Sequence, residues 1–153
     1  MDDHSFEVET EWNFKEAPGG FSRDHVVTLP GRLEINVSAA PQFGGNAEMV
    51  NPEEMLVASI SSCQMMTYLF LCFKSKMKVA AYQDQAIGVL HREGAGKFWM
   101  KSVTLKPRIR FEGADSQQAR ALAIRLIHEA HDTCFITQSI KTTVAVEPTL
   151  VFV

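Results

Sequence analysis

One segment near residue 51 constrains the fold of this chain more than any other, because it predicts where a long helix begins. Asn51 can cap a helix, Pro52 suits its first position, and two acids follow that complement the positive end of the helix dipole. The second acid, Glu54, stands three residues after Asn51, as in a capping box. The helix is expected to run to residue 73 or 75. Because it is apolar on most sides, we expect it to be the long buried central helix of the fold.

Short strands are predicted before this helix. Residues 5–12 largely alternate apolar and polar side chains, and residues 25–29 and 32–37 are β-branched or alternate in the same way. Turn signals that contain proline and glycine separate the three segments, and residues 39–46 are rich in Ala, Pro and Gly, as in a loop. The first third of the chain is therefore predicted to be a β-meander.

The sequence after the helix predicts a β-hairpin, a second helix and a C-terminal strand. These elements are expected as hairpin strands around residues 82–91 and 100–111, a helix that opens at Asp115 or Ser116 and ends near Cys134, and a strand over residues 141–153. Pro148 marks an edge or a bend in the last strand, because proline has no N–H to donate. The order of elements predicts an α+β fold in a single domain, residues 1–153.

The charge pattern of the chain argues against two classes of partner. The 15 Lys and Arg residues are balanced by 18 Asp and Glu residues, and no basic cluster stands out. Nucleic acids and anionic membranes bind to clustered positive charge, so we expect neither as a partner. The composition, with 46% hydrophobic and 22% charged residues, is that of an ordinary soluble globular protein.

The chain is expected to be cytoplasmic. Its first residues, Met-Asp-Asp-His, are acidic and lack the positive and apolar regions of a signal peptide. The longest mostly apolar stretch, Met65–Phe73, is expected to be too short to span a bilayer. In a reducing compartment three cysteines are not expected to be a structural disulfide framework, which leaves catalysis, redox chemistry or plain burial.

Cys63 and Cys72 are predicted to lie on opposite faces of the central helix. They are nine residues apart, roughly 900° around an α-helix, which excludes a disulfide between them while the helix is intact. The apolar run over residues 69–73 predicts a buried, inert thiol for Cys72. Cys63 follows two serines, and the residues alone leave close helix packing and a functional thiol open for it.

Cys134 follows a helix end that carries two histidines. His128 and His131 are one helical turn apart, and both could approach the thiol. Three interpretations stay open for this cluster: a thiolate assisted by histidine, a set of metal ligands, and ordinary polar residues at a helix end. Cys63 and Cys134 are 71 residues apart, so only the tertiary structure could pair them.

Glu53 and Arg23 have ordinary explanations when each is taken alone. Glu53 is an acid in the first turn of a helix, where it interacts favourably with the helix dipole. Arg23 is a charge in a loop that is expected to be exposed. Neither residue by itself predicts a site.

Three features together resemble the OsmC/Ohr superfamily of thiol-dependent peroxidases. The first is the helix start at residues 51–56, Asn-Pro-Glu-Glu-Met-Leu, with Cys63 ten residues after Glu53. The second is the later helix that ends His-Glu-Ala-His-Asp-Thr-Cys at Cys134. The third is the order of elements, which extends the resemblance over nearly the whole chain.

The resemblance implies a two-cysteine redox cycle. Cys63 would attack the peroxide O–O bond and become a sulfenic acid, and Cys134 would condense with it to a disulfide. A low-molecular-weight or lipoyl-type dithiol would then restore both thiols. No cofactor and no resident metal ion are expected. Apolar residues near Cys63 favour alkyl or fatty-acyl hydroperoxides over hydrogen peroxide.

The family's Arg–Glu pair is matched by Glu53 and, in the loop over residues 19–25, by Arg23. A guanidinium would lower the pKa of a thiol that burial raises, and Glu53 would hold Arg23 through a bidentate contact. Glu53 and Cys63 are about 15 Å apart along a straight helix, too far for one Arg to serve both. We therefore expect an intertwined homodimer in which one subunit's Arg23 and Glu53 lie near the other's Cys63.

The segment after Cys134 departs from the family pattern. It reads Phe-Ile-Thr-Gln-Ser over residues 135–139, where the well-known organic peroxide reductases have a Pro-Tyr-Ser or Pro-Val-Ser type of continuation. The preferred peroxide and the reductant are left open by this difference.

Two other functions compete with the peroxidase. A Cys/His hydrolase could use Cys63 or Cys134 with His131, but the sequence shows neither an orienting group nor an oxyanion hole. A non-catalytic module could bind a hydrophobic ligand, or a metal held by His128, His131 and Cys134. The spacing of those three ligands drifts around a helix, so the helix would have to end before Cys134.

Overall fold

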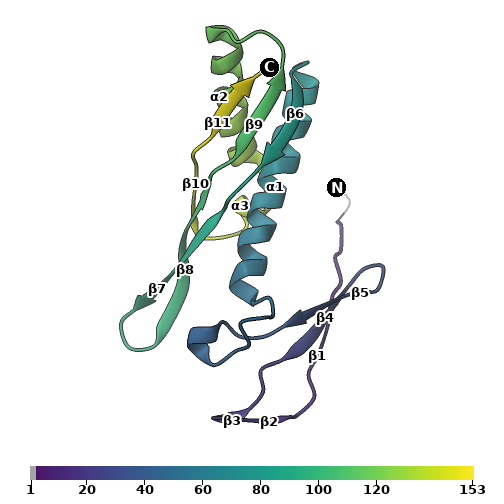
Figure 1. Cartoon of the computed structure of the whole chain (residues 1–153), viewed down its shortest axis with the longest axis vertical. Helices are drawn as coiled ribbons and strands as arrows, with labels where there is room; N and C mark the ends of the chain where they lie inside the picture. Colours follow the sequence, from purple (N-terminus) through teal and green to yellow (C-terminus); the bar gives the residue numbers. More distant parts are fainter. Residues whose placement is uncertain (1–2) are drawn as a thin grey trace. The chain divides into compact units, whose positions relative to one another are not determined.

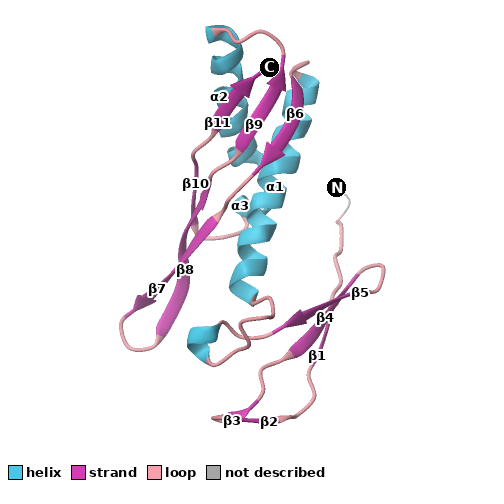
Figure 2. Cartoon of the chain, viewed as in Figure 1, coloured by secondary structure: helices cyan, strands magenta, loops and turns pink. Residues whose placement is uncertain are grey.

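The computed structural model describes residues 3–153, and it divides into two compact units between Met55 and Leu56. Met1 and Asp2, part of the acidic N-terminus considered above, lie outside the described residues. Strands precede a long helix, and strands and shorter helices follow it (Figure 1; Figure 2). The predicted α+β class and order of elements are therefore confirmed. A single domain over residues 1–153 stays a prediction.

The N-terminal unit contains the predicted β-meander, an antiparallel sheet of order β1-β4-β5. Its elements are β1 (Glu9–Glu11), β2 (Glu16–Ala17), β3 (Gly20–Phe21), β4 (His25–Leu29), β5 (Leu33–Val37) and a 3₁₀ turn, η1 (Pro41–Phe43). The strand predicted over residues 5–12 is too long, because pairing with β4 covers only β1 and the residues before it are exposed.

The long helix α1 (Pro52–Lys74) begins where the sequence predicts. The Asn51 side-chain oxygen accepts the N–H of Glu54 at 2.9 Å, and the Glu54 carboxylate accepts the N–H of Asn51 at 3.1 Å. This reciprocal pair is a capping box, which satisfies two donors that the start of a helix leaves open. A local spacing of three residues in the sequence therefore fixes the start of α1.

The end of α1 is set by a Schellman motif. Lys76 has φ 58°, and the N–H groups of Met77 and Lys76 donate to the carbonyls of Cys72 and Phe73. These two bonds close the helix and turn the chain into the next strand. Glycine is the usual residue at the left-handed position, so the lysine there carries some backbone strain.

The C-terminal unit contains two three-stranded sheets, β10-β8-β7 and β11-β9-β6. The strands are β6 (Lys78–Gln83), β7 (Ile87–Glu93), β8 (Lys97–Leu105), β9 (Arg108–Glu112), β10 (Thr143–Val146) and β11 (Thr149–Phe152). The pairs β10–β8 and β11–β9 are parallel, whereas β7–β8 and β6–β9 are antiparallel.

Each hairpin strand predicted from the sequence is in fact two strands. The strand expected at residues 82–91 breaks at Asp84, whose carboxylate accepts the N–H of Lys106 at 2.7 Å and the hydroxyl of Ser61. The strand expected at residues 100–111 breaks at Pro107, which has no N–H for a ladder. The tail bends at Pro148, as predicted, and forms β10 and β11.

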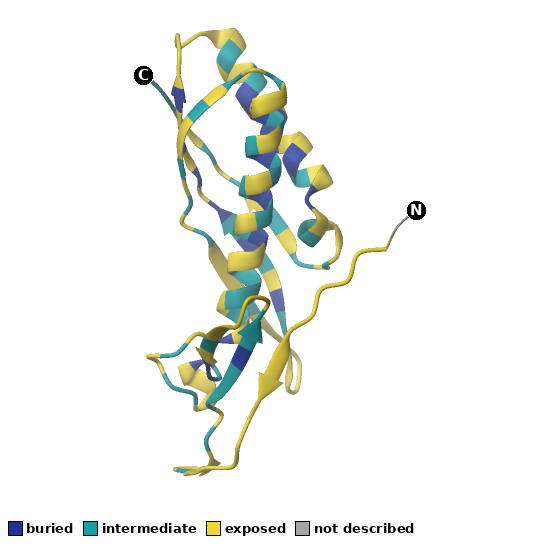
Figure 3. Ribbon diagram, turned by 90° about the vertical axis from the view of Figure 1, so that its right-hand side faces the viewer, coloured by how far each residue is buried: buried dark blue, intermediate teal, exposed yellow. Residues whose placement is uncertain are grey.

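Fewer faces of α1 are buried in this chain than the sequence predicts. The buried residues follow a four-residue spacing on one stripe of the helix: Ile60, Gln64, Tyr68 and Cys72. Ile60 packs with β8, and Tyr68 and Cys72 pack with β9 and α2, which places α1 against both sheets of its unit. Met66, Phe70 and Phe73 are 59%, 59% and 80% exposed. Figure 3 shows buried and exposed residues alternating along this long helix. The helix is a core helix with one apolar face left uncovered.

The length of α1 corrects one expectation about membranes. The helix has 23 residues and a mean hydropathy of 1.6 over its most apolar window, so by length and composition alone it could cross a bilayer. The run Met65–Phe73 is itself too short to span a bilayer, but the helix continues on its N-terminal side through Ser61, Ser62 and Gln64. Its buried stripe packs in two apolar cores, which identifies it as a core helix.

Two helices lie between β9 and β10 in the chain. Helix α2 (Gln117–Thr133) starts at Ser116, whose hydroxyl accepts the N–H of Ala119 at 3.1 Å, as the sequence predicts. Cys134 ends α2 and at the same time precedes the one-turn helix α3 (Phe135–Gln138). The extended backbone of Cys134 therefore marks a corner between two helices.

Candidate active site

The structure brings Cys63 and Cys134 together. Cys63 lies in the middle of α1, Cys134 lies at the corner between α2 and α3, and their sulfur atoms are 2.7 Å apart. Both are free thiols. Two residues 71 positions apart in the sequence thus form one pair, which is the arrangement that a reversible disulfide needs.

The packing of α1 against α2 sets this distance. The amide of Gln64, next to Cys63, donates to the carbonyl of Ile127 at 3.3 Å. One turn further along α1, the Tyr68 hydroxyl donates to the carbonyl of Ala123 at 3.4 Å. Both side chains are buried within the helix interface, so they hold the two thiols in register.

The two sulfurs differ in how readily they ionise. Burial raises the pKa of the Cys63 thiol, and the contact with Cys134 raises it further. Burial also raises the pKa of Cys134, but hydrogen bonds from Cys63 and from the backbone N–H groups of Thr137 and Ile136 outweigh it, so its pKa lies below the ordinary value. Within residues 56–153 no Lys or Arg lowers the pKa of Cys63.

A pocket of about 480 Å³ opens beside Cys63. Its lining is mostly apolar and comes from α1, the end of α2 and the start of α3: Cys63, Met66, Thr67, Phe70, Leu71, Glu129, Thr133 and Phe135. Cys63 is partly exposed at this pocket, whereas Cys134 is fully buried. A substrate in the pocket therefore meets the sulfur of Cys63 first.

Arg23 and Glu53, the other predicted site residues, both lie in the N-terminal unit. The Arg23 guanidinium lies 5.2 Å from the ring centre of Phe21, and a Cβ added to Gly44 would lie 3.3 Å from one of its nitrogens. Glu53 is in the first turn of α1, and one of its carboxylate oxygens is buried without a hydrogen-bond partner. Between residues 3 and 55 no ion pair joins the two side chains.

The two histidines of α2 are not partners of the thiol pair. His128 is exposed and His131 is half-buried, and the groups that hydrogen-bond to Cys134 come from Cys63 and α3 instead. Among the described residues no group of three or more His, Cys, Asp or Glu side chains is arranged to hold a metal ion. The geometry thus favours the interpretation that His128 and His131 are ordinary polar residues at the end of a helix.

Cys72 is separate from the pair. It is 1% exposed and packs in the core between α1, β9 and α2. Burial raises the pKa of its thiol. The predicted burial of Cys72 is therefore confirmed.

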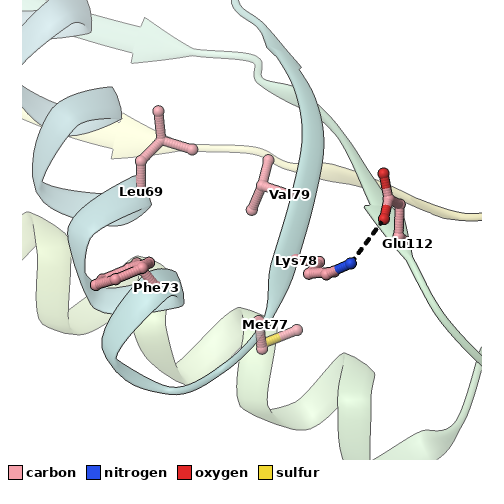
Figure 4. Close-up of a pocket in the computed structure, with 6 residues that line it drawn as sticks. All are labelled: Leu69, Phe73, Met77, Lys78, Val79 and Glu112. Carbon is pink, nitrogen blue, oxygen red and sulfur yellow. Dashed lines mark hydrogen bonds and ion pairs between the residues drawn. The ribbon is translucent and has the colours of Figure 1, made fainter.

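A second pocket, of about 440 Å³, lies at the C-terminal end of α1 (Figure 4). Leu69, Phe73, Met77 and Val79 provide its apolar lining. Lys78 and Glu112 form an ion pair of 3.4 Å at its edge. No cysteine, histidine or hydroxyl group lines this pocket, so the thiol chemistry belongs to the first one.

Sequence reasoning missed several residues around the thiols. Thr67, Phe70 and Leu71 follow Cys63 at helical spacing, so the periodicity of α1 could have placed them beside it. Glu129 and Thr133 belong to the same end of α2 as Cys134, and they line the pocket where the sequence favoured His128 and His131. Thr137 is three residues after Cys134, a spacing that brings it near the sulfur only because residues 135–138 form a helical turn, which the sequence analysis did not predict.

The chain matches one protein family. The sequence model described as OsmC-like protein matches residues 44–149. The uncharacterized protein YmaD of Bacillus subtilis is 28% identical over 142 residues, which cover 92% of this chain and 89% of that protein.

Solved structures of OsmC-like proteins are also similar to this chain. An OsmC-like protein of unknown function from Vibrio cholerae is 30% identical with a TM-score of 0.86, over 96% of this chain and 100% of that one. An organic hydroperoxide resistance protein OsmC from Legionella pneumophila has the same fold, with a TM-score of 0.68 at 15% identity over 99% of both chains.

Proposed function

The chain belongs to the OsmC-like protein family, and from that premise we propose that it is a thiol-dependent peroxidase that reduces organic hydroperoxides with Cys63 and Cys134. One observation carries the proposal: two free thiols lie 2.7 Å apart, and one of them opens into an apolar pocket. Members that share the fold include a protein named for organic hydroperoxide resistance.

The first step of the proposed reaction is oxidation of Cys63. Its thiolate attacks one oxygen of the hydroperoxide, the O–O bond breaks, and the alkoxide leaves with a proton as the alcohol. Cys63 is then a sulfenic acid. The apolar pocket, with Met66, Phe70 and Leu71, suits the alkyl or acyl chain of the substrate better than it suits hydrogen peroxide.

The second step is formation of the disulfide. The sulfur of Cys134 attacks the sulfur of the Cys63 sulfenic acid, a hydroxyl leaves as water, and the S–S bond forms. The distance of 2.7 Å between the sulfurs means that this step needs little movement of either helix. A dithiol or lipoyl-type reductant in the cytoplasm then restores both thiols.

A homodimer completes the proposed site. Burial raises the pKa of Cys63, and its own unit supplies no cation that lowers it. Arg23 of a second subunit, held by that subunit's Glu53, would supply one. The buried oxygen of Glu53 that lacks a partner supports this role, since a buried carboxylate needs a donor.

The test is single-turnover oxidation of the reduced protein by an organic hydroperoxide, beside Cys63→Ser and Cys134→Ser variants, with thiol loss and product mass followed together. Rapid conversion to a Cys63–Cys134 disulfide is expected. The reaction should be lost in Cys63→Ser and should stop at the sulfenic acid in Cys134→Ser. Slow oxidation that is indifferent to Cys63 would instead favour a carrier of hydrophobic ligands, for which the apolar pocket is the supporting observation.

A further inference from the structure

The hydroxyl of Thr137 is a buried polar group without a partner. Its oxygen is inaccessible to solvent and forms no hydrogen bond with any group of residues 3–153. A buried hydroxyl that is left unpaired destabilises a fold, so its persistence calls for an explanation. Thr137 lies three residues after Cys134, and the turn of α3 brings its side chain back to that sulfur.

The two sulfurs of the pair also differ in access. Cys63 lines the pocket of about 480 Å³ and is partly exposed, whereas Cys134 is 0% exposed. A thiol reductant that enters the pocket can therefore reach the Cys63 side of a disulfide and cannot reach the Cys134 side. In thiol–disulfide exchange, the sulfur that is not attacked leaves as a thiolate, and it leaves faster when that thiolate is stabilised.

We propose that Thr137 donates a hydrogen bond to Cys134 as that sulfur leaves, so that the reductant attacks Cys63 of the oxidised pair. This inference rests on the proposed function, because it concerns the disulfide that the peroxidase cycle forms. Thr137 contacts a reacting atom, and its hydroxyl gains the partner that it lacks in the dithiol state.

The bonds and electrons of the step balance. A reductant thiolate forms a new S–S bond to Cys63, the Cys63–Cys134 bond breaks, and its electron pair leaves on Cys134. The Thr137 hydroxyl and the N–H groups of Ile136 and Thr137 stabilise the negative sulfur. A second reductant thiol then attacks the mixed disulfide and releases Cys63. Cys63 and the backbone N–H groups of Thr137 and Ile136 hold the pKa of Cys134 below its ordinary value, which agrees with its role as the leaving group.

The experiment starts from disulfide made with diamide, so that it does not depend on peroxidase activity. The oxidised protein is mixed with 2-mercaptoethanol, quenched in acid, alkylated and mapped by mass spectrometry. We expect the mixed disulfide on Cys63 and the alkyl group on Cys134. Thr137→Val should slow cleavage by about threefold to tenfold, as expected for a poorer leaving thiolate, and Thr137→Ser should restore it. Ser139→Ala is the matched control, because that hydroxyl on the same turn already donates to the carbonyl of Phe135.

A second readout separates this role from a structural one. The ultraviolet absorbance of the Cys134 thiolate, followed against pH in a Cys63→Ser background, should shift to higher pH in Thr137→Val. A mixed disulfide on Cys134, an unchanged cleavage rate in Thr137→Val, or failure of diamide to form the disulfide would overturn the inference. Failure of a hydroperoxide to form a disulfide that diamide does form would instead reject the proposed function alone.

Discussion

Gln64 ties the two helices of the thiol pair together, because its amide donates to the carbonyl of Ile127 at 3.3 Å while its other polar atom is buried without a partner. The contact links the residue after Cys63 to α2, seven residues before Cys134. Its energetic value is small, since one of the two polar groups of Gln64 is unsatisfied. The side chain therefore acts mainly through its volume.

If Gln64 acts mainly through its volume, two substitutions at this position should have different effects. Gln64→Ala leaves a cavity between α1 and α2 and should lower the free energy of unfolding by about 2 kcal/mol. It should also slow disulfide formation, because the sulfurs are less firmly held. Gln64→Met keeps the volume, removes the unpaired oxygen, and should lie within about 1 kcal/mol of the parent. Urea unfolding and single-turnover oxidation measure both effects. Equal losses in the two variants would show that the hydrogen bond matters more than the volume.

How far the sequence predicts the structure depends on the range of the interaction. The capping box of Asn51 and Glu54 is a local signal, and it placed the start of α1 correctly. The breaks at Asp84 and Pro107 were missed. Asp84 ends a strand by bonding to Lys106 and Ser61, which are distant in sequence. Pro107, by contrast, is a local signal for a break, because its nitrogen carries no hydrogen for a ladder.

The same distinction holds for the site. Helical spacing separated Cys72 from Cys63 correctly, because both lie on α1. The closeness of Cys63 and Cys134 came only from the family resemblance, since it depends on the packing of α1 against α2. The sequence could not predict that α1 is only partly buried, for a similar reason. A helix that is apolar on most sides does not show which of its faces packs against other parts of the same chain.

The pH dependence of Cys63 offers a second prediction. Contact with Cys134 raises the pKa of Cys63, so Cys134→Ser should move the midpoint of Cys63 alkylation to lower pH. Burial remains in that variant, and the midpoint should stay above that of the urea-unfolded chain. The comparison is made in Arg23→Met protein, where the proposed cation is absent, with iodoacetamide and peptide mapping. A shift to higher pH would mean that Cys134 stabilises the Cys63 thiolate.

The pocket predicts a preference among peroxides. Phe70 lines the pocket beside Cys63 and is 59% exposed, so Phe70→Ala should fold normally. The loss of apolar contact should lower kcat/KM for a long-chain alkyl hydroperoxide by about tenfold, or about 1.4 kcal/mol, and change the rate with hydrogen peroxide much less. Phe73→Ala is the control, because Phe73 lies one turn further along α1 and lines the other pocket. Comparable rates for both peroxides in the parent protein would contradict an apolar substrate site.

The role proposed for Arg23 makes the sharpest prediction about assembly. Loss of one positioned charge donor typically costs a factor of about 100 in rate, so Arg23→Met should oxidise about 100-fold more slowly with hydroperoxide. Glu53→Gln should have a smaller effect in the same direction, because its amide still accepts a hydrogen bond from the guanidinium but no longer carries the charge.

Mixed dimers then decide which subunit supplies the arginine. Arg23→Met and Cys63→Ser chains are each nearly inactive alone, and they are unfolded together and refolded as a mixture. If Arg23 acts on the thiol of the partner, a mixed dimer pairs the intact Cys63 of one chain with the intact Arg23 of the other, and one of its two sites recovers. About half of the chains in a random mixture enter mixed dimers, so roughly a quarter of the parent activity should return. If Arg23 acts on the thiol of its own chain, mixing leaves every site defective and the activity stays at the level of the separate variants.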